Sequence, residues 1–399
     1  MKKIIILIFP FILSALYASA SPGNVLVPAK WYVNNNSLTG DIFTTAIGND
    51  GNTGTSASPF ATLQFAMGAA QAGDSIFIDA GTYVTADFTI TKGVNFVGTN
   101  YKISPNNPAD KLSANPAINA ESIISGATLT PGTSNISLLG LMFDAGNKIV
   151  INFDNTGTSN SIGNFRFIKN RVKMNASVSQ VVIIGTGNTS TSAASLVNSI
   201  FEFTDNRFEK FNASANKTLS INLVKNVTLT DNSFVVTGTA FRTQAALDIG
   251  SAGAVDQLVV SNNVVDQASY FLLGSRFVIA TFTGNIISRT PTTMQVNNQV
   301  FEGSDFQFNN NVIDASSGIN SSILFMRISG GAIGASNNIT FENNTINMTA
   351  IPAVTFQLVN FNVNIISSVV HPVVIIRGNK ITYSGNLSSV EGQNIRPIV

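Results

Sequence analysis

The sequence predicts an all-β solenoid built from stacked coils, and three observations lead to this fold class. First, one phrase recurs eight times between residues 165 and 381: apolar, any, apolar, two further residues, asparagine, any, apolar. Second, successive asparagines are 22 to 36 residues apart, the extremes being Asn263 to Asn285 and Asn170 to Asn206. Such a period is typical of repeat proteins. Third, no helical period follows residue 73, and turn-forming Gly, Asn, Ser and Thr separate the copies.

Within each phrase, apolar and polar residues alternate with a period of two, which indicates a strand with one buried face. The apolar positions hold Phe, Val, Ile and Leu, residues that suit a packed interior, and Phe, Val and Ile are also strand formers. A repeat of 22 residues is too short for a four-stranded propeller blade, which needs about 40. It suits a coil of three short strands, and the variable spacing predicts loops of variable length.

The asparagines are the most informative positions of the phrase. A buried amide must find hydrogen-bond partners, and asparagines stacked one strand spacing apart, about 4.8 Å, can bond one another and the turn backbone. The alternative is a set of exposed turn asparagines, against which the flanking apolar pairs at fixed offsets argue. We therefore expect an internal asparagine ladder made of Asn170, Asn206, Asn232, Asn263, Asn285, Asn311, Asn344 and Asn379.

Aromatic composition agrees with a stacked interior. The chain has 28 Phe but only 6 Tyr and 1 Trp. Internal stacks of Phe explain this bias, whereas a sugar-binding platform more often uses Trp or Tyr, whose polar edge suits a wet site.

The first residues have the pattern of a secretory signal peptide. Lys2 and Lys3 precede an apolar stretch over residues 4–16, and Ala18-Ser19-Ala20 is a small-residue cleavage site. The stretch is too short for a spanning helix, although an N-terminal anchor is the alternative. We expect cleavage after Ala20 and a secreted or cell-surface protein. With no Cys, disulfides, thiolate metal sites and Cys nucleophiles are excluded.

A short amphipathic helix is expected over residues 59–72. Ser58 suits its N-cap and Pro59 its first position, and Gly73 would end it. Its apolar face would consist of Phe60, Leu63, Met67 and Ala70. Residues 74–78 then alternate as a strand. A helix placed before stacked coils would cover the apolar end of the solenoid.

This N-terminal segment resembles a known family. The order of its short sequences is Tyr32-Val33, Gly48-Asn49-Asp50-Gly51, Gly54-Thr55, Ser58-Pro59-Phe60-Ala61-Thr62-Leu63-Gln64, Ala72-Gly73-Asp74-Ser75-Ile76 and Ala80-Gly81-Thr82-Tyr83. It resembles the N-terminal cap of right-handed parallel β-helix proteins of the pectin-lyase-like superfamily, many of which are exported bacterial proteins. The resemblance implies a right-handed parallel β-helix with a capping helix. It does not imply one function, because the superfamily includes lyases, hydrolases and adhesins.

The expected organisation is a signal peptide over residues 1–20 and one β-helix domain over residues 21–399. Within that domain, residues 31–87 form the N-terminal cap, 88–383 the coils and 384–399 a C-terminal tail.

Charge and hydropathy limit the partners. Net charge is +1 and charged residues are 11% of the chain. The sequence also contains no basic tract of the kind that binds nucleic acid, so no nucleic-acid partner is expected. The sequence after residue 20 has no apolar run long enough to predict a membrane-spanning helix in the mature chain. We expect a monomer whose possible partner is a polysaccharide or a cell-surface glycan.

Catalytic patterns are sparse. A polysaccharide lyase needs a base and a positive charge, often Ca²⁺, which takes six to eight oxygen ligands. Asp205 and Asp231 occupy the same position of adjacent coils and could share a cation, although exposed turn residues are the simpler interpretation. The only His, His371, is followed by Pro372 and is expected at the surface. The superfamily's paired aspartates, Asp-His pair and Arg-x-Pro-x-x-Arg run are not present, so no catalytic residue, cofactor or metal is predicted.

One basic cluster stands out, formed by Arg166, Lys169, Arg171 and Lys173. It could contact an acidic polysaccharide. However, the equivalent positions of the next copy are Glu202, Asp205, Arg207 and Glu209. We therefore expect Arg166 to face Glu202 and Lys173 to face Glu209, as cross-strand charge pairs worth a few tenths of a kcal/mol each.

These observations favour a secreted or surface-exposed β-helix protein, adhesin-like, that contacts a glycan or another surface without catalysis. One alternative is a polysaccharide lyase acting on an acidic glycan, which needs a groove with a base and cation ligands. Another is a structural spacer of a larger surface assembly, which needs neither a groove nor exposed aromatic residues.

Overall fold

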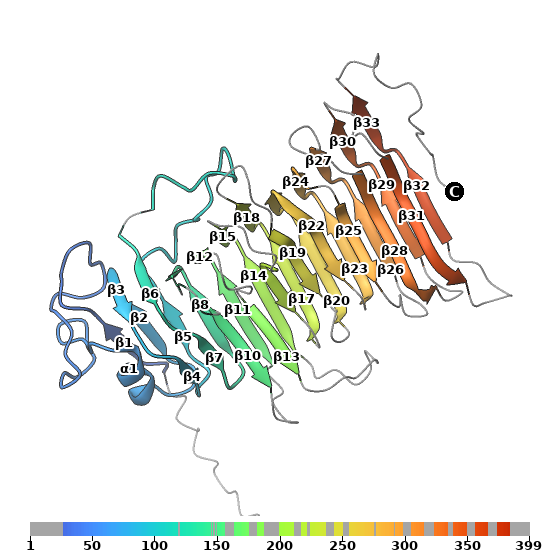
Figure 1. The fold of residues 1–399 in the computed structure, drawn as a ribbon. Helices are drawn as coiled ribbons and strands as arrows, with labels where there is room; N and C mark the ends of the chain where they lie inside the picture. The colour runs from blue at the N-terminus through green and yellow to red at the C-terminus, as the bar shows by residue number, and fades with distance from the viewer. Residues whose placement is uncertain are drawn as a thin grey trace, which may run out of the picture.

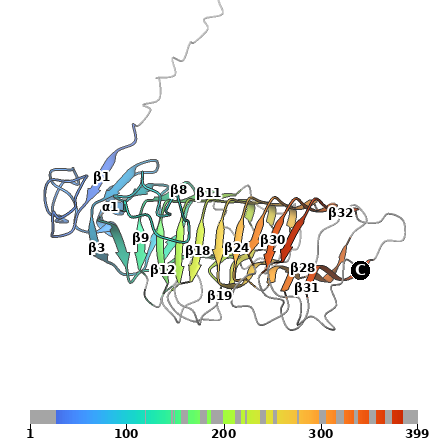
Figure 2. The same cartoon turned by 90° about the horizontal axis from the view of Figure 1, so that it is seen from above.

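The chain forms an elongated stack of coils that runs from the N-terminal cap to the last described strands (Figures 1 and 2). The computed structural model describes residues 27–118, 120–144, 146, 148, 150–155, 163–174, 182–186, 199–210, 217–221, 224–236, 243–249, 255–274, 277–290, 292–297, 305–314, 323–333, 338–348, 356–365 and 373–383. The predicted signal peptide, the predicted tail and His371 lie outside these residues.

Three parallel sheets make up the stack. The first sheet has 12 strands: β1 (Lys30–Val33), β2 (Ser75–Ile78), β5 (Asn95–Val97), β8 (Ile136–Leu139), β11 (Asn164–Ile168), β14 (Ile200–Thr204), β17 (Val224–Thr230), β20 (Val255–Ser261), β23 (Phe277–Thr283), β26 (Asp305–Asn309), β29 (Asn338–Glu342) and β32 (Val373–Arg377). The second sheet has 11: β3 (Gly81–Val84), β6 (Ser122–Ser125), β9 (Met142–Asp144), β12 (Arg171–Met174), β15 (Arg207–Lys210), β18 (Ser233–Val236), β21 (Val264–Asp266), β24 (Ile286–Ser288), β27 (Val312–Asp314), β30 (Thr345–Met348) and β33 (Lys380–Tyr383). The third has 10: β4 (Phe88–Ile90), β7 (Leu129–Pro131), β10 (Ile151–Asn155), β13 (Val182–Thr186), β16 (Leu219–Ile221), β19 (Thr243–Ile249), β22 (Ala268–Gly274), β25 (Thr292–Asn297), β28 (Ile323–Ile333) and β31 (Phe356–Ile365).

Each coil contributes one strand to each sheet in turn, and each strand pairs in parallel with its counterpart in the next coil. Parallel strands joined by such crossovers are almost always connected with a right-handed sense. The predicted fold class is therefore confirmed. The protein is a right-handed parallel β-helix.

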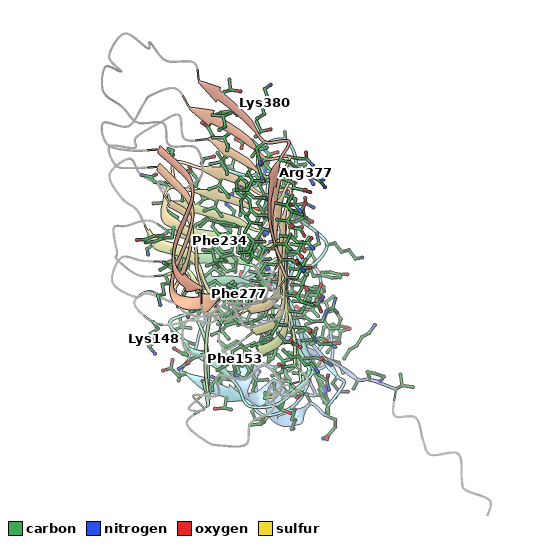
Figure 3. The ribbon with its side chains drawn as sticks, turned by 90° about the vertical axis from the view of Figure 1, so that its right-hand side faces the viewer. Lys148, Phe153, Phe234, Phe277, Arg377 and Lys380 are labelled. Atoms are coloured by element: carbon green, nitrogen blue, oxygen red, sulfur yellow. The ribbon has the colours of Figure 1, made fainter. Side chains whose placement is uncertain are left out.

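Inward side chains of equivalent strands stack along the axis and form the core. Phe165 is aligned with Phe201, and their ring centroids are 5.9 Å apart. Figure 3 shows Phe153, Phe234 and Phe277 inside the stack, whereas Lys148, Arg377 and Lys380 lie at its outer surface. Stacked internal Phe rings thus explain much of the aromatic bias of the sequence.

The predicted asparagine ladder runs through the turn between the first and second sheets. Oδ1 of Asn170 accepts from Leu141 N at 2.9 Å, and each later side-chain oxygen accepts hydrogen bonds from the asparagine one coil earlier. Oδ1 of Asn232, for example, accepts from the backbone N and the Nδ2 of Asn206 at 3.0 and 2.9 Å. Its own Nδ2 donates to the Phe203 carbonyl at 2.8 Å and to Oδ1 of Asn263 at 3.0 Å. The ladder continues unbroken from Asn170 to Asn379.

A left-handed residue precedes each ladder asparagine and sets the turn. Asp205 and Asp231 have φ of 54° and 59°, and Gly284 and Gly378 have φ of 66°. Asn, Asp and Gly tolerate this conformation best. The turn points the following asparagine inward, and the asparagines from Asn170 to Asn344 are fully buried.

One short helix, α1 (Leu63–Ala69), packs against β1 at the N-terminal end of the stack (Figure 1). Thr62 is its N-cap and Ala70 its C-cap, so Gly73 lies beyond its end. Phe60, Leu63, Met67 and Ala70 are all buried, as predicted. In the described part of the chain, no helix is long and apolar enough to cross a membrane.

The predicted start of the helix is wrong. The backbone N of Phe60 donates to the Tyr32 carbonyl and its carbonyl accepts from Asn34 N, both at 2.9 Å. These bonds hold Phe60 as an extension of β1, so the backbone around Ser58 and Pro59 cannot form the first helical turn. The helix begins only after this pairing ends.

A long segment between β5 and β6, which we call the strap (residues 98–118), extends along the stack toward β15 and β18 (Figure 1). Nδ2 of Asn106 donates to Asp205 Oδ1 at 3.1 Å and to the Asp231 carbonyl at 3.3 Å. Nη1 and Nη2 of Arg207 donate to the carbonyls of Lys111 and Leu112 at 3.1 and 2.9 Å. The strap therefore ties the cap to turns about 100 residues later in sequence, a separation shown by the Asn106–Asn206 contact.

Candidate functional site

A hollow of about 770 Å³ lies on the outer surface of the first sheet, over β5, β8, β11 and β14. We call it the groove. Its lining residues are Ala72, Gly73, Gly93, Asn95, Thr133, Ser134, Asn135, Ile136, Ser137, Asn164, Arg166, Ile200 and Glu202. Six of the 13 lining residues carry a hydroxyl or an amide side chain, two are Ile, and no aromatic side chain is part of the lining.

Strand alternation positions the groove side chains. Because Phe165 and Phe167 point into the core, Asn164 and Arg166 must point outward. The loops beside the strands approach closely. A Cβ on Gly93 would lie 2.5 Å from the Ser134 carbonyl, so a larger residue there would push the loops apart.

The groove contains one ion pair. Nε of Arg166 donates to Oε2 of Glu202 at 2.9 Å, and their side chains are 52% and 33% exposed. Thr204 Oγ1 also donates to Oε1 of Glu202 at 3.2 Å. Because the two charges compensate each other, the groove offers hydroxyls, amides and one polarised pair instead of a concentrated charge.

The predicted alignment of the charged strands is found. Arg166 is aligned with Glu202, and Lys173 with Glu209. Lys169 Nζ lies 2.7 Å from Asp205 Oδ2. The Glu209 carboxylate, however, is held by Arg171 at 3.0 Å and by Arg207, and not by Lys173. The expected ion pair between Lys173 and Glu209 is thus replaced by a network of two guanidinium groups.

The four cations of the predicted cluster do not share one surface. Arg166 lines the groove on the first sheet, Lys169 lies in the turn, and Arg171 and Lys173 belong to β12 of the second sheet. Whether they contact a polyanion stays a prediction. Their separation over different faces disfavours a single shared site.

Around Arg171 the network is partly buried, and burial and charge pairing act in opposite directions on its pKa values. Burial raises the pKa of Glu121 above its ordinary value, although Arg171 acts in the opposite direction. Burial also lowers the pKa of Arg171, but the carboxylates of Glu209 and Glu121 outweigh it and raise the pKa overall. The arrangement links adjacent coils, since Arg171 of β12 and Arg207 of β15 both pair with Glu209.

Asp205 and Asp231 each pair with a different lysine. The Asp205 carboxylate, 18% exposed, accepts from Lys169 and from Ser104 and Asn106 of the strap. Lys111 of the strap pairs with Asp231 at 2.9 Å. The interpretation of Asp205 as a solvent-exposed turn residue is therefore wrong, because the strap covers it. Among the described residues, no group of three His, Cys, Asp or Glu could hold a metal ion.

Sequence reasoning could not find the groove. Its residues come from strands of four coils and from three loops before strands, and most of them are Ser, Thr, Asn or Gly, which are common throughout the chain. Of these residues, only Arg166 and its expected partner Glu202 were singled out, by their charge.

Comparison with known proteins gives a family match but no activity. The model of a family described as a protein of unknown function (DUF1565) matches residues 46–102. The match lies largely within the N-terminal segment that resembles pectin-lyase-like β-helices. No curated protein matches the chain.

Two solved structures are similar at low identity. One is the GH136 lacto-N-biosidase from Eubacterium ramulus, with 9% identity, a TM-score of 0.36, and coverage of 89% of this chain and 68% of that chain. Another is a rhamnogalacturonan lyase, with 11% identity, a TM-score of 0.32, and coverage of 88% and 87%. These values are too low to transfer a substrate or a catalytic residue.

Proposed function

We propose that the protein is an exported β-helix that contacts a glycan through the groove without catalysing a reaction. The observation that carries the proposal is the lining of the groove, in which hydroxyl and amide side chains surround one compensated ion pair. Such side chains both donate and accept hydrogen bonds, as sugar hydroxyls do. An extended sheet face suits a chain-like ligand.

The lining argues against hydrolysis in the groove. Glycoside hydrolases use two carboxyl groups that flank the scissile bond. Glu202 is the only carboxylate among the lining residues, and its oxygens accept from Arg166 and Thr204. A general acid and a general base would both have to come from elsewhere.

A lyase acting on an acidic glycan is the second candidate. The half-exposed Arg166 could bind a uronate carboxylate, which is the observation that favours it. The reaction also requires a base near the proton to be abstracted. No neutral His, Lys or Tyr side chain belongs to the groove lining. The third candidate is a structural spacer, a role that does not require a groove.

Calorimetric titration with neutral and acidic oligosaccharides tests the proposal. Asn164→Ala and Arg166→Ala should each raise Kd by about tenfold, the factor that corresponds to 1.4 kcal/mol. Thr281→Ala and Gln307→Ala are matched controls, because these residues share the outward register of Arg166 on β23 and β26, outside the groove. Equal affinity in the groove variants and the controls would reject the groove as the contact site.

A further inference from the structure

Four aromatic side chains form a surface cluster, which we call the aromatic shelf: Tyr32, Phe43 and Phe77 of the cap, and Tyr101 of the strap. The stacked rings of Tyr32 and Phe77, on β1 and β2, have centroids 5.4 Å apart. Phe43 packs edge-on against Phe77 at 5.1 Å and against Tyr101 at 6.0 Å. All four side chains are partly exposed, unlike the buried Phe stacks of the coils.

The loop that carries Phe43 is held by the buried carboxylate of Asp79. Asp79 is fully buried, and its carboxylate accepts from the backbone N of Ile42, Phe43 and Thr44 at 2.7, 3.0 and 2.7 Å. Thr44 Oγ1 adds a fourth bond at 2.8 Å. Phe43 is therefore held on the surface before any ligand arrives, which reduces the entropy lost on binding.

Two lysines flank the shelf. Lys30 Nζ lies 6.0 Å from the centroid of the Phe77 ring, and Lys102 Nζ lies 5.1 Å from that of Tyr101. Both lysines are exposed, and neither forms an ion pair with a carboxylate among the described residues, unlike Arg166, Lys169 and Arg171. Lys30 and Lys102 are therefore available to pair with an anionic ligand.

Strand register connects the shelf to the groove. Lys30 shares an outward position with Ser75, Asn95, Ser137 and Arg166 of successive strands, the last three of which line the groove. The neighbouring outward position runs from Tyr32 and Phe77 to Leu139 and Ile168, and it is interrupted by Val97, which is buried. A ligand lying along the axis would therefore follow the polar row from Lys30 to Arg166.

We propose that the shelf is a second subsite of the same glycan face and that it selects anionic glycans. Apolar faces of sugar rings pack on Phe43 and Tyr101, and anionic substituents pair with Lys30 and Lys102. The anion is a carboxylate or a sulfate, since an ammonium group pairs with either. This inference rests on the proposed function and adds a charge preference to it.

Binding of the full chain to three probes tests the inference: oligogalacturonate for carboxylate, heparin oligosaccharide for sulfate, and a neutral galactan oligosaccharide. The double variant Lys30→Gln/Lys102→Gln should raise Kd for an anionic probe by about tenfold at low salt, corresponding to 1.4 kcal/mol, and leave the neutral probe unchanged. The difference should shrink as salt screens the exposed charges. Tyr101→Ala should weaken the binding of the anionic probe as well.

Lys225→Gln, at a partly exposed lysine of β17, and Phe65→Ala, at an exposed ring of α1, are the matched controls. If the shelf variants bind like the controls while Asn164→Ala weakens binding, the inference fails and the proposed function stands. If Tyr101→Ala lowers the Tm but binds normally, the shelf serves only to pack the cap. If the unmodified chain binds none of the probes, the proposed function fails together with the inference.

Discussion

The indole Nε1 of Trp31 donates a hydrogen bond of 2.9 Å to Oδ2 of Asp74. The same carboxylate accepts from the backbone N of Ala29 at 2.7 Å and of Gln71 at 2.8 Å. One side chain thus joins β1, the segment after α1 and the start of β2. Trp31 is the only tryptophan of the chain, so its fluorescence reports on this junction.

Asp74 should make the cap sensitive to acid. Burial alone would raise the pKa of Asp74, but the bonds from Gln71, Trp31 and Ala29 and the charge of Lys92 lower it below 3.8 overall. Because the pKa of Asp74 is lower in the folded state, its carboxylate stabilises the folded cap fully at pH values above the unfolded-state pKa. This stabilisation is lost as the pH falls through the folded-state pKa. Trp31 fluorescence should therefore change below about pH 4.

The Asp74→Asn variant should lose about 1–3 kcal/mol at neutral pH and show a weaker acid transition of its Trp31 fluorescence. Asp256→Asn, on β20, is a control outside the cap. An unchanged acid transition in Asp74→Asn would show that other carboxylates control the junction.

Replacing a ladder asparagine should destabilise the stack. Asn232→Leu removes the acceptor of Asn206 N and the donor to the Phe203 carbonyl, and both groups would remain buried without partners. We expect a loss of about 1–3 kcal/mol in urea unfolding. The same change at the exposed Asn338 should have little effect, and equal losses at both sites would contradict the ladder's role.

Glu209 and Glu202 should differ in their contribution to stability. Glu209 is 3% exposed and holds both Arg171 and Arg207. Glu209→Ala should cost about 3–5 kcal/mol, because the buried Arg207 would lose its carboxylate partner and Arg171 would keep only Glu121. Glu202 pairs with the half-exposed Arg166, so Glu202→Ala should cost at most about 1 kcal/mol. The Tm of the two variants, measured by thermal unfolding, tests this difference. Equal Tm values would contradict the larger contribution of the Glu209 network.

The strap should detach when Asn106 is shortened. Asn106 is 2% exposed and bonds to Asp205 and to the Asn206 and Asp231 carbonyls. Asn106→Ala should cost about 1–3 kcal/mol and speed protease cleavage within residues 98–118. Asn107→Ala is the neighbouring control, since Asn107 Oδ1 accepts only from Ala109 N among the recorded hydrogen bonds. Equal cleavage rates would mean that Asn106 does not fasten the strap.

Much of the fold follows from the sequence because its determinants are local. The phrase around each ladder asparagine carries the strand alternation, the left-handed residue and the inward amide within a few positions. The start of α1 could not be predicted in this way. Phe60 carries a helix-compatible pattern, but its pairing with Tyr32 and Asn34 of the distant β1 segment takes precedence.

The candidate site was less predictable than the fold. The repeat offset correctly aligned Arg166 with Glu202, because strand register transmits sequence spacing into space. It could not anticipate the ion pair between Arg207 and Glu209. Both residues lie in β15, so their contact does not depend on the offset between coils, and Arg207 occupies the carboxylate that was expected to bind Lys173 of the preceding coil. The strap and the segments that form the aromatic shelf carry no copy of the repeated phrase, so spacing could not predict their contacts.

The fate of a bound glycan tests the central claim most directly. Oligosaccharides that bind the full chain should be incubated with it at saturating concentration, with and without Ca²⁺. Reducing ends and unsaturated-product absorbance are then followed in the same samples. The proposed function predicts binding that Arg166→Ala weakens and recovery of the oligosaccharide intact. Cleavage products that form with the unmodified chain and disappear in Arg166→Ala or Glu202→Ala would contradict it and establish a lyase or a hydrolase.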